Sequence, residues 1–475
     1  MEHGSALEQI DSRPLAGHQR SIIALAIVAN VSEFFDMFLI GFAVVQLQKE
    51  WSLGGFETGV ILACSGLGTV LGSVLWGRAA DRMGRRRTFF WCVLLFTVFT
   101  LASVFTPTGW WMMLALLRVL VGVGVGGLNI VSIPYVQEFV PTRQRGLLAG
   151  LGSVFIPLGL FLGSLAQRVL HDSWRGLIAL GVVPILLLAW IRIVPESPRF
   201  LLSQGREREA RESIAWALEM SPDAVGALPP VRTGPRVAYR ELLREHLRAL
   251  LIVSAGSFCF ILGSFTVQSW GQTLLEVGFT DIGADAVGTL FMGVSLVDLL
   301  GRLASAWLAD RIGRRWTLFS FGILGALGAL IVAFSAHWET SWVVFFTGIC
   351  ITMGFGDGAF GILNAFGGEQ FPNDARGTGL GLGYGIGASA KILGPLLMGA
   401  MIGSGSLQEL AHPLAAVFPA FLFFAAMLVL GAWSTCWPVR PRGRPSRTSE
   451  RPGASRPSAA AGRGGRARRR TCRCW

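Results

Sequence analysis

The sequence has few of the side chains from which metal and redox sites are built. None of its six histidines falls inside a long apolar run, so the usual imidazole ligand or proton relay is missing from the apolar part of the chain. The seven cysteines show neither a CxxC spacing nor a disulfide framework, because five are scattered through apolar stretches and two lie near the C-terminal end. We therefore expect no metal and no cofactor, and any proton that the protein moves has to travel on carboxyl groups.

Charge is scarce too, and lysine is almost absent. Charged residues make up 15% of the 475 residues and hydrophobic residues 52%, with a mean hydropathy of +0.55. A chain this long and apolar cannot form one soluble core, so lipid has to serve as its solvent. The net charge of +12 would suit a nucleic-acid binder, but the basic residues form short clusters between apolar runs, so we expect no nucleic-acid partner. Lys49 and Lys391 are the two lysines among many arginines, a coding bias typical of GC-rich bacteria.

Twelve apolar runs reach the ~20 residues that a membrane-spanning helix needs. They lie at about 21–46, 57–78, 88–106, 111–137, 147–170, 176–194, 247–268, 286–309, 317–336, 342–368, 377–402 and 413–436. Arginine-rich loops alternate with arginine-poor ones, which by the positive-inside rule predicts that both termini are cytoplasmic. The fold class predicted is an all-α membrane protein of twelve helices in a bacterial inner membrane.

One long polar interruption divides the twelve runs into two sets of six. We predict a cytoplasmic N-terminal segment, two six-helix bundles separated by a cytoplasmic loop, and a disordered basic tail. The boundaries predicted for these five parts are 1–20, 21–194, 195–246, 247–437 and 438–475. Within the loop, the apolar spacing of 206–220 predicts a short amphipathic helix on the cytoplasmic membrane surface.

Two motifs occur once in each half. The sequence ADRMGRR around Asp81 returns as ADRIGRR around Asp310, 229 residues later. The sequence EFVPTRQRG that begins at Glu138 returns as EQFPNDARG at Glu369, 231 residues later. Two independent motifs at nearly one offset predict two duplicated halves of parallel topology.

At these residues the chain resembles the major facilitator superfamily, over about residues 20–437. The DRxGRR loops are a hallmark of that superfamily, and the run PESPRFL from Pro195 is similar to sugar porters and their organic-ion and aromatic-acid relatives. The resemblance implies a carrier of a small molecule that works by rocking of its two halves, and we expect it to be a monomer. No catalytic constellation is found, so we expect no enzyme.

The repeated loops predict a cytoplasmic gate, because forked arginines can bind the acidic residues, and the aspartates can meet a helix N-terminus. Arginines that serve only as topology signals facing lipid phosphates are the alternative, but such a signal needs no acid. The predicted gate residues are Gly77, Asp81, Arg82, Gly84, Arg85, Glu138, Arg145, Glu196, Arg199, Asp310, Arg311, Gly313, Arg314, Glu369 and Arg376.

A few ionisable side chains fall at membrane depth, where each needs a partner or a task. At ~1.5 Å per residue, Asp36 lies ~15 Å and Arg118 ~10 Å below the outer surface, so the two are expected to meet. Separation from the arginine would let Asp36 take a proton, and the resemblance to proton-linked sugar porters implies that such a pair couples transport to protons. Glu33 lies near the same helix face and resembles part of the acidic signature of aromatic-acid symporters. A static pair that only fixes helix packing is the alternative.

Lys391 predicts an anion site. A lone ammonium facing a central space would bind a carboxylate, and organic-anion relatives have a basic residue at a matching place. A structural ion pair with Asp357 on the preceding helix is the alternative. Asp298 and Arg302, four residues apart, predict an intrahelical pair or a part of the gate.

The glutamines with which hexose porters bind sugar are missing, and the corresponding positions look like Ser153 and Leu160. Aromatic side chains could instead stack on a ring. The candidate substrate-binding residues are Lys391, Asp357, Phe34, Phe35, Trp270 and Ser153. We predict symport of protons with a small organic anion, of which an aromatic carboxylate is one class. A neutral or sugar-like solute and a non-transporting membrane sensor are the alternatives.

Overall fold

The structure is a computed structural model that describes residues 5–170, 172–228, 239–279, 281–372, 375–403 and 414–437. In these ranges the protein contains helices and no strand, and twelve segments are long and apolar enough to cross a membrane. The predicted fold class of twelve spanning helices is thereby confirmed. The predicted tail, 438–475, lies outside the described residues, as does 229–238 of the central loop.

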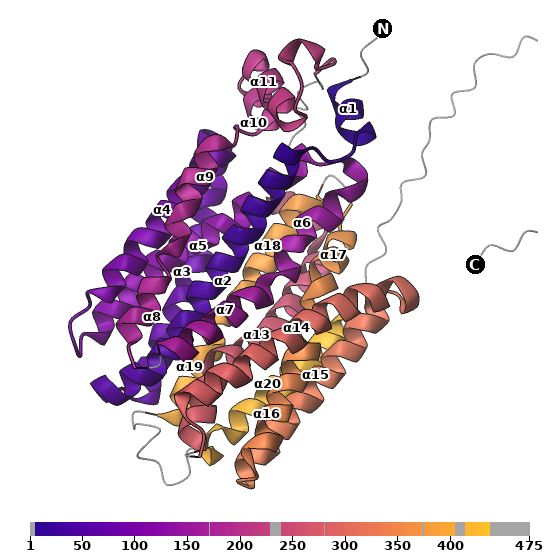
Figure 1. Ribbon diagram of the computed structural model, residues 1–475. Coiled ribbons are helices and arrows are strands. Elements are labelled where there is room, and N and C mark those ends of the chain that lie inside the picture. The colour runs from indigo at the N-terminus through magenta and orange to yellow at the C-terminus, as the bar shows by residue number, and fades with distance from the viewer. Residues whose placement is uncertain are drawn as a thin grey trace, which may run out of the picture. The chain divides into compact units, whose positions relative to one another are not determined.

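The first six spans lie within residues 17–193, and two of them are broken into shorter helices (Figure 1). The helices are α2 (Gly17–Trp51), α3 (Gly55–Met83), α4 (Arg85–Val104), α5 (Trp111–Phe139), α6 (Arg145–Val154), α7 (Ile156–Val169), α8 (Trp174–Leu180), the 3-10 turn η2 (Val183–Leu186) and α9 (Leu187–Ile193). The break between α6 and α7 has a local cause, since Pro157 in the first turn of α7 has no backbone N–H to continue the helix.

The second six spans are formed by residues 247–435. They contain α13 (Leu247–Gly278), α14 (Ala284–Ile312), α15 (Arg314–His337), α16 (Trp342–Ile351), the π-helical segment η4 (Thr352–Asp357), α17 (Phe360–Glu369), α18 (Arg376–Ala388), α19 (Ala390–Ile402), the 3-10 turn η6 (Ala415–Val417) and α20 (Phe418–Thr435). The π-helical segment interrupts the tenth span, where the sequence predicts one continuous helix. A π turn holds one residue more than an α turn, so it changes the direction in which the following side chains point.

Equivalent glycines end two helices in the two halves, as the sequence repeat requires. Gly84 follows α3 with φ +94° and ψ 165°, and Gly313 follows α14 with φ +86° and ψ 151°. Only glycine adopts this region readily, which allows α4 and α15 to begin at the next residue. The predicted duplication is therefore visible in the backbone as well as in the sequence.

Short helices occur outside the spans. They are α1 (Ala6–Ser12), α10 (Pro198–Ser203), α11 (Glu207–Ala217), the 3-10 turn η3 (Pro222–Ala224) and α12 (Tyr239–Glu245). Of these, α1, α10 and α11 lie together beyond one end of the spans (Figure 1). The amphipathic helix predicted for 206–220 is present as α11. Its apolar residue Ile214 packs with Ile10 of α1 and with Val225, so protein covers its apolar face.

The two halves contact each other along α2 and α13, α3 and α19, and α7 and α14 (Figure 1). Glycines let these helices approach closely. A Cβ atom on Gly59 of α3 would lie 2.7 Å from the carbonyl oxygen of Pro395 on α19, and one on Gly288 of α14 would lie 2.9 Å from that of Ser164 on α7. These contacts lie opposite to the arginine-rich loops, so the halves are closely packed at that end.

Candidate functional site

Helices α2 and α5 bring Asp36 and Arg118 together, as the depth argument predicts. The Arg118 Nη1 atom donates to Asp36 Oδ2 at 3.2 Å, and Nη2 donates to Oδ1 at 3.4 Å. The hydroxyl of Thr100 on α4 donates to the same carboxylate at 3.3 Å. Asp36 is 3% exposed and Arg118 is 0% exposed, so one buried acid balances one buried base.

The surroundings of this pair explain how deeply it is buried. Gly181, at the end of α8, packs so closely that a Cβ atom there would lie 2.8 Å from Asp36 Oδ1. Gly159 of α7 packs in the same way on the backbone of α2, since a Cβ atom there would lie 2.7 Å from the Val31 carbonyl oxygen. Glu33 lies one turn before Asp36 and is fully buried. Any exchange of a proton with water at these acids therefore requires movement of the surrounding helices.

Lys391 lies between the two halves on α19, and its side chain is buried. Its Nζ atom is 5.2 Å from the ring centre of Phe34 on α2 and 5.6 Å from that of Phe265 on α13. The residue is 5% exposed, and no carboxylate of the described residues forms an ion pair with it. Two aromatic faces offset part of the cost of burying the ammonium group, but they supply no counter-ion.

Asp357 pairs with Arg302 of α14 and not with Lys391, so the alternative pairing of Lys391 with Asp357 is wrong. The depth of two residues along their helices does not determine in which direction their side chains point. Asp357 is the last residue of the π-helical segment, which changes that direction. Arg302 also binds Asp298 at 3.0 Å, which confirms that intrahelical pair. Its Nη1 atom donates to the backbone carbonyl of Ser153 on α6 at 2.7 Å. Two candidate substrate-binding residues, Asp357 and Ser153, are thus held by one arginine.

The two remaining aromatic candidates have different surroundings. Phe35 on α2 is partly buried and packs against the main hydrophobic core. Trp270 on α13 is 0% exposed, and its indole Nε1 atom has no hydrogen-bond partner in the described part of the chain. Of the aromatic candidates, Phe34 is the one whose ring faces Lys391.

Two buried glutamines escaped the sequence prediction. Gln167 on α7 and Gln272 on α13 are at most 1% exposed, and neither amide oxygen nor amide nitrogen finds a partner among the described residues. Gln272 approaches α2, because a Cβ atom on Gly41 would lie 2.8 Å from its Oε1 atom. Buried polar groups are nearly always hydrogen-bonded, so these amides are available to a polar ligand. Their signal in the sequence is a glutamine within or next to an apolar run.

The first repeated loop forms a compact polar cluster. Arg85 Nε binds Glu138 Oε1 at 2.6 Å, and the Ser197 hydroxyl donates to the same carboxylate. Glu196 Oε1 accepts from the backbone N–H groups of Arg85 and Arg86 at 2.8 and 3.0 Å. A carboxylate at this position satisfies free donors at the start of α4 and the positive end of its dipole.

The second repeated loop reproduces the central ion pair. Arg314 Nη1 binds Glu369 Oε1 at 2.6 Å, and Arg376 Nε donates to the Gly368 carbonyl at 2.9 Å. Both ion pairs join two helices of the same half, α4 with α5 and α15 with α17. They hold the form of each half, and neither of them connects the halves.

The other predicted gate residues take different positions. The guanidinium of Arg311 lies over the ring of Trp307 at 3.9 Å. Three residues are exposed and form no ion pair with another described residue, namely Arg82, Arg199 and Asp310. Asp81 lies at the exposed end of α3, and Gly77 lies two turns before that end. The side chain of Arg145 lies outside the described residues.

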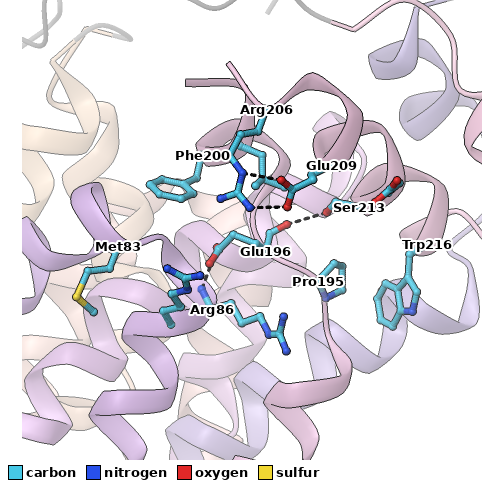
Figure 2. A pocket seen from close by; sticks show the side chains of 12 residues that line it. Met83, Arg86, Pro195, Glu196, Phe200, Arg206, Glu209, Ser213 and Trp216 are labelled. Carbon is cyan, nitrogen blue, oxygen red and sulfur yellow. Dashed lines mark hydrogen bonds and ion pairs between the residues drawn. The ribbon is translucent and has the colours of Figure 1, made fainter. Parts of the chain in front are cut away.

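A cavity of about 410 Å³ opens beside the first loop (Figure 2). Its lining consists of Met83, Arg86, Arg87, Pro195, Glu196, Phe200, Leu201, Arg206, Glu209, Glu212, Ser213 and Trp216. Arg206 and Glu209 face each other across 2.7 Å, and this hydrogen bond raises the pKa of the Arg206 guanidinium. The Ser213 hydroxyl donates to the Glu196 carbonyl oxygen. Acids and bases occur here in equal number, so the cavity belongs to the loop cluster and has no excess charge for an ionic ligand.

Twelve spans in two duplicated halves, with buried charges between them, define a polytopic membrane carrier. The family model of the Major Facilitator Superfamily matches residues 26–395 and, in a second match, 280–471. The chain therefore belongs to the Major Facilitator Superfamily. It is a multi-pass membrane transporter of a small molecule and not an enzyme.

Curated relatives cover most of the chain. The niacin transporter NiaP of Acinetobacter baylyi is 27% identical over 82% of this chain and 89% of its own length. The gallate transporter of Pseudomonas putida is 29% identical over 89% of this chain and 94% of its own length. The D-xylose transporter of Levilactobacillus brevis is 25% identical over 78% of this chain and 85% of its own length.

Solved structures share the fold at lower identity. A D-xylose-proton symporter aligns with a TM-score of 0.70 and 19% identity over 88% of this chain and 97% of that one. The xylose transporter XylE from E. coli, in a partially occluded inward open conformation, aligns with a TM-score of 0.67 and 18% identity over the same shares.

Proposed function

We propose that this carrier couples the movement of protons to that of a small organic anion, and that the anion is an aromatic carboxylate. The observation that carries the proposal is the environment of Lys391, a buried ammonium group between two aromatic rings with no acidic partner in the described part of the chain. A buried charge without a counter-ion is costly, so a ligand that supplies the negative charge is favoured.

An aromatic carboxylate matches both components of this site. Its carboxylate would bind Lys391 Nζ through a charge-assisted hydrogen bond, and its ring would lie among the side chains of Phe34 and Phe265. These rings come from opposite halves, so the ligand would contact both. Gln272 lies about two helical turns after Phe265 on α13, and its free amide offers hydrogen bonds to hydroxyl or ring-nitrogen groups.

The names of two relatives support this substrate class. Niacin and gallate are both aromatic carboxylates, and proteins named for them align with most of this chain. The relative named for D-xylose supports a neutral, polyhydroxylated solute as the second candidate. The buried ammonium group favours the acid, because a sugar has no negative charge for it.

Proton coupling is assigned to Asp36 and Arg118, with Glu33 as a neighbouring acid. While the guanidinium balances the carboxylate, Asp36 stays charged. Rocking of the halves or ligand binding would separate the pair, and a buried carboxylate without its arginine takes a proton. Helices α2 and α7 are packed in the first half, and α7 also contacts α14 of the second half, which provides a mechanical connection to the pair.

The remaining assignments follow from topology. We place both termini and the arginine-rich loops in the cytoplasm of a bacterium, with the spans in its inner membrane and the protein acting as a monomer. The loop clusters of Arg85 with Glu138 and Arg314 with Glu369 would then form the cytoplasmic gate region. One bacterial relative, the inner membrane metabolite transport protein YgcS of Escherichia coli, supports this location.

Uptake by purified protein in liposomes tests the proposal, with radiolabelled nicotinate, gallate and D-xylose as probes. We expect nicotinate or gallate to accumulate under an inward proton gradient and not after an uncoupler has been added. Lys391→Met keeps the side-chain length and removes the charge, so it should weaken binding of the acid about 10- to 100-fold. Lys391→Arg should retain part of the affinity.

Arg206→Ala serves as the matched control, because it removes an exposed cation at the residue that precedes α11. Its affinity for the acid should equal that of the wild type. Accumulation of D-xylose without accumulation of either acid would reject the anion assignment, as would an unchanged dissociation constant for Lys391→Met.

A further inference from the structure

Arg302 connects three separate parts of the fold through its three guanidinium nitrogens. Nε donates to Asp298 on the same helix at 3.0 Å, and Nη2 donates to Asp357 at the end of the π-helical segment. Nη1 donates to the carbonyl oxygen of Ser153 on α6 at 2.7 Å, which crosses from the second half to the first. Exposure is 3% for Arg302, 0% for Asp298 and 5% for Asp357.

The charges in this cluster do not balance. Two carboxylates surround one guanidinium, so full ionisation would leave a net negative charge in a buried place. The Asp36 pair differs in this respect, because there one acid faces one base. Removing the excess charge at Arg302 requires either another cation or one proton.

No other described cation faces the cluster. The ionisable side chains on the neighbouring helices lie at the ends of those helices or are paired elsewhere. Those side chains are Arg168 on α7, the exposed Arg248 at the start of α13 and Glu276 near its end, Arg314, Arg315 and His337 on α15, and Glu369 on α17. Arg168 lies beside Gly288 of α14, which is ten residues, or ~15 Å along the helix, from Asp298.

The geometry also provides a position for a proton. Asp298 Oδ2 is buried and accepts no hydrogen bond from a described donor. Asp298 and Asp357 bind the Nε and Nη2 atoms of the same guanidinium group, so the two carboxyl groups are neighbours. Two acids that share a site hold a proton between them, because like charges at this distance destabilise each other.

We propose that Asp298 and Asp357 share one proton beside Arg302, which makes this cluster a second proton-binding site, in the opposite half from Asp36. The proton forms an O–H bond to one carboxyl oxygen and leaves to water when the site opens. Its place in transport rests on the proposed proton coupling, whereas the protonation itself does not.

Infrared spectroscopy of the purified protein tests the shared proton without any transported molecule. In difference spectra between neutral and alkaline pH, the wild type should show a carboxylic-acid C=O band that shifts in D₂O. Asp298→Asn and Asp357→Asn each leave one carboxylate beside one guanidinium, so each variant should lose that C=O band. The matched controls Asp36→Asn and Glu33→Gln should retain it. A wild type without the band, or its survival in both cluster variants, would overturn the proposal.

The pH dependence of thermal stability provides a second measurement. The folded wild type would bind one proton that the unfolded chain lacks at neutral pH, so its melting temperature should fall as the pH rises. In Asp298→Asn this fall should be smaller, since the variant has no shared proton to lose. Equal slopes in the two proteins would count against the shared proton. Neither measurement uses a transported molecule, so both test the shared proton even if the proposed substrate class is wrong.

Discussion

Arg118 binds Asp36 through two guanidinium nitrogens inside the first half, and neither side chain is more than 3% exposed. A buried ion pair contributes little net stability, but loss of one partner leaves the other charge uncompensated. The pair is therefore sensitive to single changes and tolerant of the loss of both charges.

The Asp36→Asn variant should lower stability by about 3–5 kcal/mol, because it leaves the Arg118 charge buried alone. The double variant Asp36→Asn/Arg118→Gln should recover most of that loss. Melting temperatures in detergent provide the measurement. In liposomes, Asp36→Asn should exchange nicotinate across the membrane but fail to accumulate it under a proton gradient. Full accumulation by the variant would remove Asp36 from proton coupling.

Substitutions at the contact between Arg302 and Ser153 should have very different effects. Ser153→Ala should be nearly neutral in both stability and transport, because the acceptor is the backbone carbonyl, which alanine retains. Arg302→Gln should destabilise strongly, by about 3–5 kcal/mol, because two buried acids lose their cation. A large effect of Ser153→Ala on substrate affinity, with stability unchanged, would instead show that the hydroxyl binds the ligand.

The repeated glycines offer an internally controlled test. Gly84→Ala and Gly313→Ala both place a Cβ atom in a glycine-only backbone region, at a cost of about 1–3 kcal/mol each. At Gly84 the added atom would also lie 2.4 Å from Glu196 Oε2, whereas at Gly313 nothing lies within 4 Å. Gly84→Ala should therefore have the lower melting temperature. Equal losses would mean that Glu196 moves aside without cost.

The two repeated ion pairs should differ in strength. Glu138 is 7% exposed and also accepts from the Ser197 hydroxyl, while Glu369 is 52% exposed. Exposed pairs contribute about 0–1 kcal/mol, so Glu369→Gln should change the melting temperature little. Glu138→Gln should destabilise clearly more and should slow transport, because it loosens the cluster at the start of α4. The reverse order would contradict this interpretation of the duplicated loops.

Much of the architecture could be predicted from the sequence, because apolar length and the repeated motifs determine the number of spans and the duplication. The meeting of Asp36 and Arg118 followed from depth alone. The partner of Asp357 could not be predicted in this way. Depth places Asp357 near Lys391, but the π-helical segment before it contributes to its direction, and the sequence shows no proline or other signal for that segment.

What covers the apolar face of α11 could not be predicted from the sequence either. Its periodicity predicts an apolar face, but an apolar face has the same sequence whether lipid or protein covers it. Ile10 and Val225 cover it here, and they are separated from each other by more than two hundred residues of chain. The free amides of Gln167 and Gln272 were missed for the opposite reason, since uncharged polar residues stand out less than charges among apolar ones.

The rings beside Lys391 belong to different halves, so the distance between those halves determines how far apart the two rings lie. A thin, flat acid would fit between Phe34 and Phe265 without forcing them apart. A thicker acid could still reach the ammonium group but would wedge the rings open and prevent closure. Bulky aromatic acids are therefore expected to act as competitive inhibitors that the protein does not carry.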